Sequence, residues 1–454
     1  MSNYKKYPKY RDSGVEWLGE VPESWEVKKL KFIAYAKPSN VDKKSKDSEK
    51  DVLLCNYTDV YYNDFITNDI EFMKATATDE QIKKFTLEVD DVIITKDSEG
   101  PEDIAIATCV QEVQDNLICG YHLTHIKPTG CNGRYLFRAF NSDGIHDQFK
   151  VAANGITRYG LGVYGIDNAW FPLPPLQEQQ TIANYLDKAT TKIDTLIEKQ
   201  TRLIELLKEK RQAVISATVT RGLDSTVAMK DSGVEWLGEI PVHWDTVAMK
   251  LILDIRDGTH DTPSYIDDGL DSFPLVTSKD FVDNSISFSK TKYISKKDHI
   301  LIRSRSKVDN GDVLMSMIGG NIGKSLIANV DREISIKNVA LFKTSENPIL
   351  AQLLLFYLDS YLMSVQIDLQ NRGGAQGFLS LGDIRNLVFP KIPLMEQKAI
   401  VTYLTDKTSK IDNLITKSTK AIDLLKEKRT ALISAVVTGK IDVRGFEKDN
   451  IDEV

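Results

Sequence analysis

The chain of 454 residues is poor in cysteine. Its four cysteines all fall in the first half and show no CxxC spacing: Cys55, Cys109, Cys119 and Cys131. So few cysteines in so long a chain do not form a disulfide framework, which favours a reducing, cytoplasmic setting. Cys119 lies near His122 and His125, but this spacing matches no standard zinc site, so we expect no bound metal.

Long apolar runs are also missing. The opening MSNYKKYPKY has no apolar stretch, so no secretory signal is expected. The most apolar segment, residues 349–363, is interrupted by Gln352 and Asp359. It is shorter than the ~20 residues of a membrane span, so it predicts a buried helix and no membrane contact.

No set of catalytic residues stands out, because the sequence contains neither GxSxG nor HExxH and its six histidines are scattered. Two segments only resemble nucleotide sites. GLGVYG (160–165) is followed by IDNAWFPLPP, which we do not expect to form a helix, and IGGNIGKS (318–325) has Ile318 where a P-loop has glycine. We predict a flexible loop for the first and a strand after the second, and an enzyme acting alone is not expected.

The net charge of −7 argues mildly against nucleic-acid binding, although binding depends on local patches rather than on the whole chain. The content of 42% hydrophobic and 27% charged residues is typical of a soluble globular protein.

The chain repeats itself. RDSGVEWLGEVP begins at Arg11, and KDSGVEWLGEIP begins at Lys230. A second pair of segments, PLPPLQEQ from Pro172 and PKIPLMEQ from Pro390, precedes two similar stretches that each contain LLKEKR. The sequences between these markers diverge. The repeat therefore predicts two domain-sized halves with a common scaffold and different versions of one task.

Each shared ending predicts a helix of about 42 residues, roughly 63 Å long. Apolar residues recur at alternating steps of four and three, with misfits at Gln200, Lys210, Lys407, Ser418 and Lys428. Two matched apolar seams in one chain favour pairing, and a two-fold relation makes the pair antiparallel. A solvated helix with its own ion pairs is the alternative. The same symmetry predicts that the chain ends lie close together.

The two divergent middles share a plan of mixed α and β structure. Strands are predicted at residues 89–96, 103–110 and 121–128, and again at 311–320, 324–330 and 336–344. A helix follows each set, near Tyr135 and near Leu350. The predicted fold class is therefore α+β: two mixed α/β domains joined by two long helices in an antiparallel coiled coil, with a pseudo-two-fold repeat. The predicted ranges are 1–174, 175–221, 222–392 and 393–454.

Polar loops in these middles are candidates for contacts with DNA. Arg, Asn and Gln can make paired hydrogen bonds to guanine and adenine edges, and glycine lets the backbone approach closely. Ordinary solvated loops are the alternative. The candidates are Lys96, Arg158, Tyr159, Thr259, His260, Thr262, Lys324, Asn371, Arg372 and Gln376.

The paired markers, the segments PLPPLQEQ and PKIPLMEQ, and DGTHDTP at 257–263 resemble the specificity (S) subunits of type I restriction–modification enzymes. The resemblance covers nearly the whole chain. It implies that each middle is a target recognition domain for one half of a bipartite, asymmetric site in double-stranded DNA, with an unread spacer. DGTHDTP occurs only in the second half, so the DNA-contacting loops of the first half are less well defined.

The resemblance also implies partners. Two methyltransferase (M) subunits and the restriction (R) subunits would supply catalysis and bind S-adenosylmethionine, ATP and Mg, and this chain would bind no cofactor. We predict that the helix ends dock the M subunits through Glu178, Gln179, Glu396 and Gln397. A two-headed coiled-coil scaffold that does not bind DNA remains the alternative.

Overall fold

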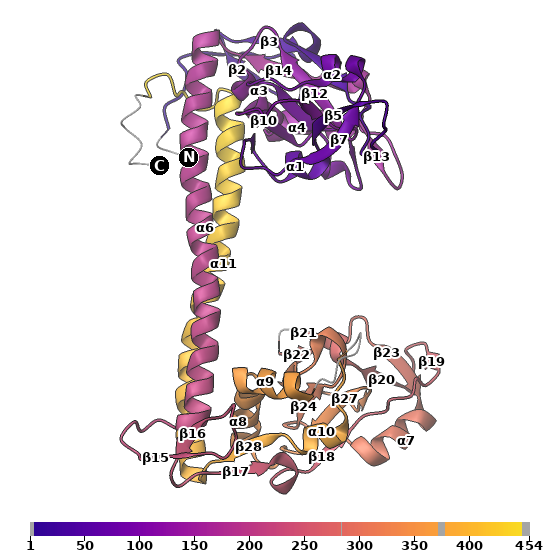
Figure 1. The fold of residues 1–454 in the computed structure, drawn as a ribbon, viewed down its shortest axis with the longest axis vertical. Coiled ribbons are helices and arrows are strands. Elements are labelled where there is room, and N and C mark those ends of the chain that lie inside the picture. Colours follow the sequence, from indigo (N-terminus) through magenta and orange to yellow (C-terminus); the bar gives the residue numbers. More distant parts are fainter. Residues whose placement is uncertain (1–3, 283, 371–376, 447–454) are drawn as a thin grey trace. The chain divides into compact units, whose positions relative to one another are not determined.

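The computed structural model describes residues 4–282, 284–370 and 377–446. The chain divides into two compact units (Figure 1). The first contains Met1–Gln200 and Lys420–Val454, and the second contains Thr201–Thr419.

The first unit is built around a five-stranded sheet in the order β4-β12-β8-β10-β6. All neighbours are antiparallel except β10 and β6. Helices α3 (Gly133–Phe140) and α4 (Asp143–Ala152) add buried side chains to its core. The strands are β4 (Ala34–Pro38), β12 (Leu123–Pro128), β8 (Val92–Thr95), β10 (Ala107–Val110) and β6 (Phe65–Ile66). A smaller sheet joins β11 (Leu117–Cys119), β5 (Lys50–Cys55) and β7 (Met73–Ala77).

The second unit repeats this plan with a four-stranded sheet in the order β18-β27-β24-β25. These strands are Ile255–Asp257, Val339–Phe342, Val313–Ser316 and Ser325–Ile327. Helix α8 (Pro348–Leu358) packs into the core and is followed by α9 (Tyr361–Gln370). A second sheet contains β19 (Tyr265–Ile266), β23 (Lys292–Ser295), β20 (Ser272–Val276) and β26 (Ser335–Ile336), beside α7 (Lys296–Ser306). All six predicted strands and both predicted helices are thus confirmed.

Residues 349–363 fall in α8 and the start of α9, and most of their apolar side chains are buried, as predicted. Within the described residues, no single helix has the length and apolar content to cross a membrane. Only α8 and α9 taken together do, and they are bent by 66°.

The long helices are α6 (Leu176–Arg221) and α11 (Leu394–Val437), whose starts lie one residue after the predicted ones. In the first unit, α6 and α11 are antiparallel, because Asp194 contacts Arg429 while the backbones near Pro172 and Val437 both meet the hydroxyl of Tyr135. The two helices are also antiparallel in the second unit, where Arg211 contacts Asp412 and Gly222 lies near Glu396. Antiparallel pairing is therefore confirmed within each unit.

The predicted seam is only partly correct. Ile182, Leu186, Ile400 and Leu404 are buried near the helix starts, where the globular parts cover them. Leu196, Leu203 and Leu414, farther along the helices, are exposed. Ile193, Leu207 and Ile411 lie close to them in the sequence and are buried, so the apolar contact along the helices is discontinuous.

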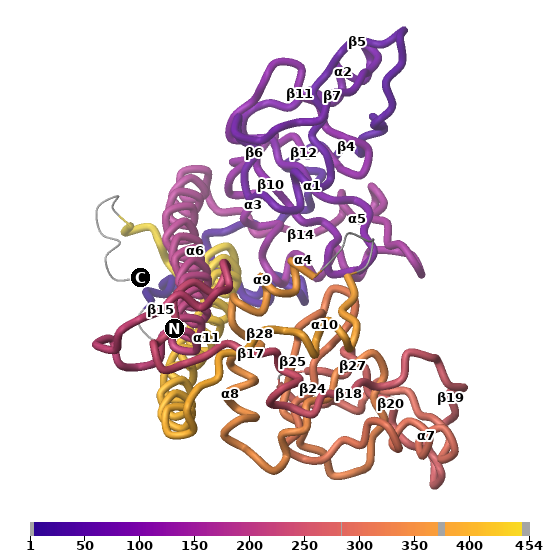
Figure 2. Tube along the Cα trace, turned by 60° about the horizontal axis from the view of Figure 1, so that its bottom comes forward, coloured from indigo at the N-terminus to yellow at the C-terminus, as the bar shows by residue number. Residues whose placement is uncertain are grey.

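The described residues nearest the two chain ends contact each other in the first unit, as predicted. The hydroxyl of Tyr10 donates to the carbonyl of Gly439 (2.9 Å), and the amide of Asp442 donates to the carbonyl of Lys5 (2.8 Å). Figure 2 shows the first described residues and the segment after α11 next to each other beside α6. Gly439 has a positive φ of 73°, which ends the last turn after α11 in a conformation that favours glycine.

Both nucleotide-site look-alikes acquire a definite structure. Contrary to the prediction of a flexible loop, GLGVYG leads into the short helix α5 (Val163–Asn168). The segment after it, expected not to be helical, supplies the last three residues of α5 before β14 (Trp170–Leu173) begins. IGGNIGKS forms a 3₁₀ turn at Gly319–Asn321 and then β25, so a strand follows it, as predicted.

Candidate nucleic-acid interface

In the first unit, backbone hydrogen bonds bring several loops together at one end of the sheet. Ser39, after β4, donates to Leu123 at the start of β12 (2.9 Å). Lys96, after β8, donates to His122 (3.0 Å), and the carbonyl of Lys96 accepts from Leu161 before α5 (2.8 Å). The loops after β4 and β8 and before β12 and α5 therefore form one rigid frame.

The second unit builds the same frame. Gly258, after β18, donates to Val339 at the start of β27 (2.9 Å). Met317, after β24, donates to Asn338 (3.1 Å) and accepts from Leu379 (2.9 Å), which precedes α10 (Leu381–Arg385). Three corresponding hydrogen bonds thus define equivalent sites in two parts of the chain with different sequences.

The frame of the first unit gathers three predicted residues. The ammonium of Lys96 donates to the carbonyl of Ser39 (2.8 Å) and lies 4.6 Å from the ring centre of Tyr121. Burial lowers the pKa of Lys96 below its usual range. Arg158 is exposed, with one guanidinium nitrogen 3.1 Å from Nδ1 of His122, and Tyr159 pairs with β9 (Asp97–Ser98). Fixed donors and an aromatic ring therefore share one surface.

The frame of the second unit brings together three more of the predicted residues, His260, Thr262 and Thr259. His260 contacts Asn338 through Nδ1 (2.9 Å) and Asp257 through Nε2 (2.8 Å), which fixes the direction of its exposed ring. The ammonium of Lys337 donates to the hydroxyl of Thr262, which is exposed. Thr259 is buried, and its backbone pairs with Lys337, so it shapes the loop instead of presenting a side chain.

The other candidates lie elsewhere. Lys324 donates to the carbonyl of Phe281 (2.6 Å) and lines a cleft with Arg211 and residues 405–416 of α11, so it does not join the frame around His260. Asn371, Arg372 and Gln376 lie outside the described residues.

Sequence reasoning missed several members of both frames: Tyr121, Lys337, Asn338 and, as a frame residue, His122. Each lies in the short loop before a central strand, β12 or β27. Asn338 has a φ of 53°, which asparagine tolerates better than most residues. Its position between Lys337 and the apolar residues Val339–Phe342 was the signal that the sequence offered.

The predicted docking residues are less exposed than expected. Glu178 is 8% exposed and accepts from the hydroxyl of Tyr7 (2.5 Å) and the indole of Trp25 (3.1 Å). Gln179 is 2% exposed and accepts from the amide of Asn132 (2.8 Å). The expected exposure of these two residues is wrong, because Tyr7, Trp25 and the loop before α3 cover the start of α6.

In the second unit the same positions are half-buried. Glu396 contacts Nε2 of His243 (2.7 Å) and the indole of Trp244 (3.1 Å). Gln397 donates to the carbonyl of Ile392 (2.8 Å). All four residues therefore hold the helix starts against their own unit.

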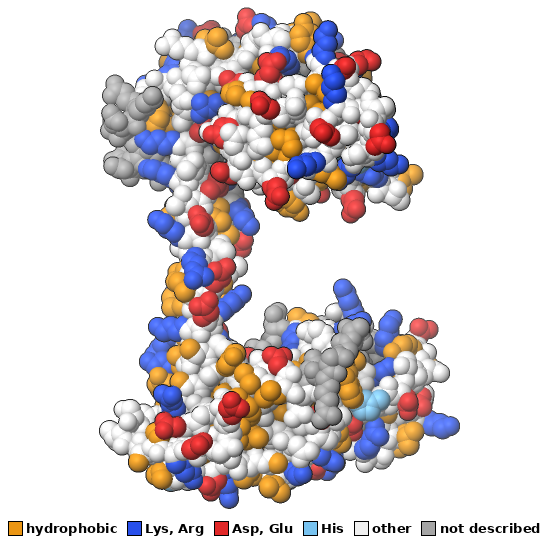
Figure 3. All heavy atoms as spheres, viewed as in Figure 1, with side chains coloured by type: hydrophobic (Ala, Val, Ile, Leu, Met, Phe, Trp, Pro, Cys, Tyr) orange, Lys and Arg blue, Asp and Glu red, His pale blue; other side chains and the backbone are white. Residues whose placement is uncertain are grey.

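Charged side chains of both signs are interspersed over the face of each unit drawn in Figure 3. Any DNA-contacting patch is therefore local. His122 pairs with Asp97 (2.9 Å) at the surface, and His125 pairs with Asp91 (2.7 Å) in the core. Across residues 4–282, 284–370 and 377–446, no cluster of His, Cys, Asp or Glu is arranged to hold a metal ion.

The sequence matches the type I restriction modification DNA specificity domain twice, over residues 22–206 and 241–423. It is 24% identical to the type I restriction enzyme MjaVIII specificity subunit of Methanocaldococcus jannaschii, over 94% of this chain and 95% of that protein. It is also 24% identical to the EcoBI specificity subunit of Escherichia coli, over 68% of this chain and 66% of that protein.

Solved structures show the same fold. One is a chain from a study of assembly and conformational transition in the type I R-M system, with a TM-score of 0.69 and 17% identity over 92% of this chain and 98% of that chain. Another is the HsdS subunit of Thermoanaerobacter tengcongensis, with a TM-score of 0.52 and 19% identity over 93% and 98%. Because the two family matches together span most of the sequence, the chain belongs to the family of type I restriction–modification DNA specificity subunits.

Proposed function

We propose that each unit recognises one half of a bipartite, asymmetric site in double-stranded DNA. The observation that carries this proposal is the pair of equivalent frames with different side chains. His122 occupies the position that Asn338 holds in the second unit, and Lys96 corresponds to the buried Met317. Equal frames would approach a base pair alike, while unlike side chains select different base edges.

The two long helices are the proposed determinant of spacer length. Each begins in one unit and ends in the other, without an internal break in its helical assignment. A helix rises about 1.5 Å per residue and duplex DNA about 3.4 Å per base pair. A fixed number of helical residues would therefore select a fixed number of unread base pairs.

Catalysis is assigned to partner subunits. Two M subunits would methylate adenine with S-adenosylmethionine, R subunits would cut DNA with ATP and Mg, and this chain would direct both in the cytoplasm. The absence of a recognisable catalytic motif from the sequence supports this division.

The test is to express the chain with its M subunit in a host that lacks adenine methylation and to map methylated adenines across the genome. We expect one motif with two different half-sites and a gap of constant length. A continuous or palindromic motif would contradict the proposal.

A DNA-free scaffold is distinguished by a second measurement. The assembled complex should retain a duplex that carries the mapped motif. Its affinity for that duplex should fall by orders of magnitude between about 50 and 200 mM salt, because binding releases counterions from the DNA. If the chain assembles with M but the complex retains neither the specific duplex nor a random one, the scaffold is favoured.

A further inference from the structure

In both units, one loop of the recognition frame leaves an edge strand of the main sheet. The edge strands are β4 and β18, and we refer to the segments that follow them, from Ser39 and from Gly258, as the edge loops. Ser39 and Gly258 are both buried. The outer side of an edge strand offers no backbone donors, so a buried carbonyl there needs a donor from another part of the protein.

A cation supplies this donor in both units. Nζ of Lys96 donates to the carbonyl of Ser39 over 2.8 Å. Nη2 of Arg305 donates to the carbonyl of Gly258 over 2.9 Å. Lys96 follows β8 of the main sheet, whereas Arg305 lies in the last turn of α7. Because the second unit has the uncharged Met317 where the first has Lys96, it makes the same contact with a residue from a different element.

Helix α7 does not need Arg305 for its own packing. Its buried side chains are His299, Ile302 and Ser306, while Arg305 is exposed. Among the residues that the structure describes, the carbonyl of Gly258 is the only hydrogen-bond partner of the Arg305 guanidinium. The contact therefore acts on the edge loop and not on the helix.

The carbonyl of Gly258 lies at the start of the loop that carries His260. The amide of the next residue, Thr259, donates to the carbonyl of Ile336 (3.0 Å). A Cβ at Gly258 would lie only 2.1 Å from the same carbonyl oxygen, so this close approach of two backbones requires glycine. Since glycine is the most flexible residue of the chain, a loop that begins with it gains most from an external contact such as that of Arg305.

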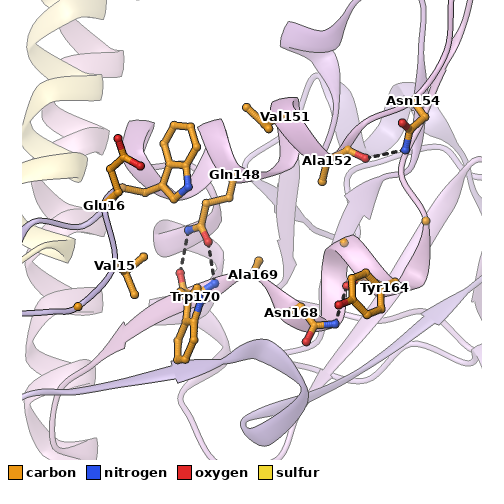
Figure 4. Close-up of a pocket in the computed structure, with 14 residues that line it drawn as sticks. Val15, Glu16, Gln148, Val151, Ala152, Asn154, Tyr164, Asn168, Ala169 and Trp170 are labelled. Atoms are coloured by element: carbon orange, nitrogen blue, oxygen red, sulfur yellow. Dashed lines mark hydrogen bonds between the residues drawn. The ribbon is translucent and has the colours of Figure 1, made fainter.

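A second arginine anchors the same edge strand. Nε and Nη2 of Arg385 on α10 both donate to the carbonyl of Ile255 (3.1 and 2.8 Å), the first residue of β18. The first unit has Asp167 of α5 at the corresponding position, and a carboxylate cannot donate. A cavity of about 700 Å³ lies beside α5, where Asn168 instead donates to the carbonyl of Tyr164 within the helix (2.9 Å; Figure 4). The edge strand of the second unit is thus held by arginines at its start and just after its end.

We propose that Arg305 is a positioning residue for recognition of the second half-site, and that Lys96 has the same role for the first. Each cation holds the carbonyl at the start of an edge loop, so the loop meets the DNA already ordered. Binding then does not lose the conformational entropy of ordering it. This inference rests on the proposed function, and it gives Lys96 a role other than the base contact expected from the sequence.

The first measurement is hydrogen exchange at the amides of Gly258 and Thr259, by mass spectrometry of the full chain without DNA. In Arg305→Ala we expect exchange to be about tenfold faster, because one hydrogen bond from a charged donor is lost. Arg305→Lys should exchange like the unmodified chain, since a lysine makes the equivalent contact in the first unit. Amides of α8, in the core of the same unit, report whether each variant is folded.

The second measurement is the affinity of the complex with the M subunit for duplexes with base changes in each half-site. Arg305→Ala should reduce the preference for the cognate second half-site by about tenfold, comparable with one mismatched base pair, and leave the first half-site unchanged. Lys96→Met, which installs the residue that the second unit has in this position, should affect only the first half-site. Lys297→Ala is the matched control, because it removes the charge of another exposed residue of α7.

Unchanged exchange in Arg305→Ala, or faster exchange with unchanged selection in the second half-site, would overturn the positioning role. An equal loss of affinity for specific and random duplexes would make Arg305 a phosphate contact and would also overturn it. Failure of the unmodified complex to select either half-site would overturn the proposed function, while hydrogen exchange would still decide whether Arg305 holds the loop.

Discussion

In the first unit, Nε of Arg429 on α11 donates a 2.9 Å hydrogen bond to Oδ1 of Asp194 on α6. The same pair recurs in the second unit, where Arg211 donates to Asp412 over 3.0 Å. Asp412 lies 218 residues after Asp194, and Arg429 lies 218 residues after Arg211. The duplication has therefore preserved the ion pair, with the arginine on α11 in the first unit and on α6 in the second. Each arginine also contacts a carboxylate of its globular part, Asp64 for Arg429 and Asp359 for Arg211.

Replacing Arg429 by lysine should destabilise the protein. A single ammonium cannot contact Asp194 and Asp64 in the geometry of a planar guanidinium, and hydrogen bonds to charged groups contribute about 1.5–3 kcal/mol each. We expect a loss of about 1–2 kcal/mol in the free energy of unfolding, measured with urea. Arg202→Lys is the control, because Arg202 is exposed and pairs with the exposed Glu205 on its own helix. The effect of this control on the free energy of unfolding should stay within about 0.5 kcal/mol. Equal effects would contradict the bridging role.

Replacing Glu178 by alanine should also cost stability, more than the same change at Glu396. Removal of the Glu178 carboxylate leaves the hydroxyl of Tyr7 and the indole of Trp25 buried without their acceptor, a loss of about 1–3 kcal/mol. Glu396 is half-exposed, so water can replace it. The order of the two melting temperatures tests this, and a lower melting temperature for Glu396→Ala would contradict it.

The repeat made much of the fold predictable. Helix length, antiparallel pairing and the meeting of the chain ends follow from symmetry, and β-branched runs located the central strands. Long-range burial was harder to predict. Glu178 looks like a surface residue at a helix start, and only the tertiary contact with Tyr7 and Trp25 shows that it is internal.

The recognition frames, too, depend on long-range contacts that the sequence does not reveal. Arg158 and His260 could be predicted from polar, glycine-containing loops. Their partners His122 and Asn338 lie in other loops, and backbone hydrogen bonds between distant segments bring them together. Periodicity within a segment carries no information on such contacts.

Stability should fall as the solution is acidified below neutral pH. Burial lowers the pKa of His146, whose Nε2 lies 2.6 Å from the carbonyl of Ile104, and burial also lowers the pKa of His299. As pH falls through the ordinary histidine pKa of about 6.5, the unfolded chain takes up protons before the folded one does. Each histidine then reduces the unfolding free energy by up to about 1.4 kcal/mol per pH unit.

Urea unfolding at pH 7.5 and 5.5 measures this dependence. His146→Gln, which keeps a donor for Ile104, should be less sensitive to acid than the unmodified protein. An identical loss of stability in the variant and the parent would show that His146 does not contribute.

The recognition frames should act on separate halves of the DNA site. Arg158→Ala removes an exposed donor beside His122, and His260→Ala removes the ring held by Asn338 and Asp257. If each contacts a base edge, its loss should cost about 1–3 kcal/mol against the cognate sequence and relax selection in one half-site only. Binding to duplexes with systematic base changes in each half measures this, with Lys208→Ala on the exposed face of α6 as the control. A uniform loss on specific and random DNA would instead make the residue a phosphate contact, and reduced selection in both half-sites by one substitution would contradict independent recognition by the two units.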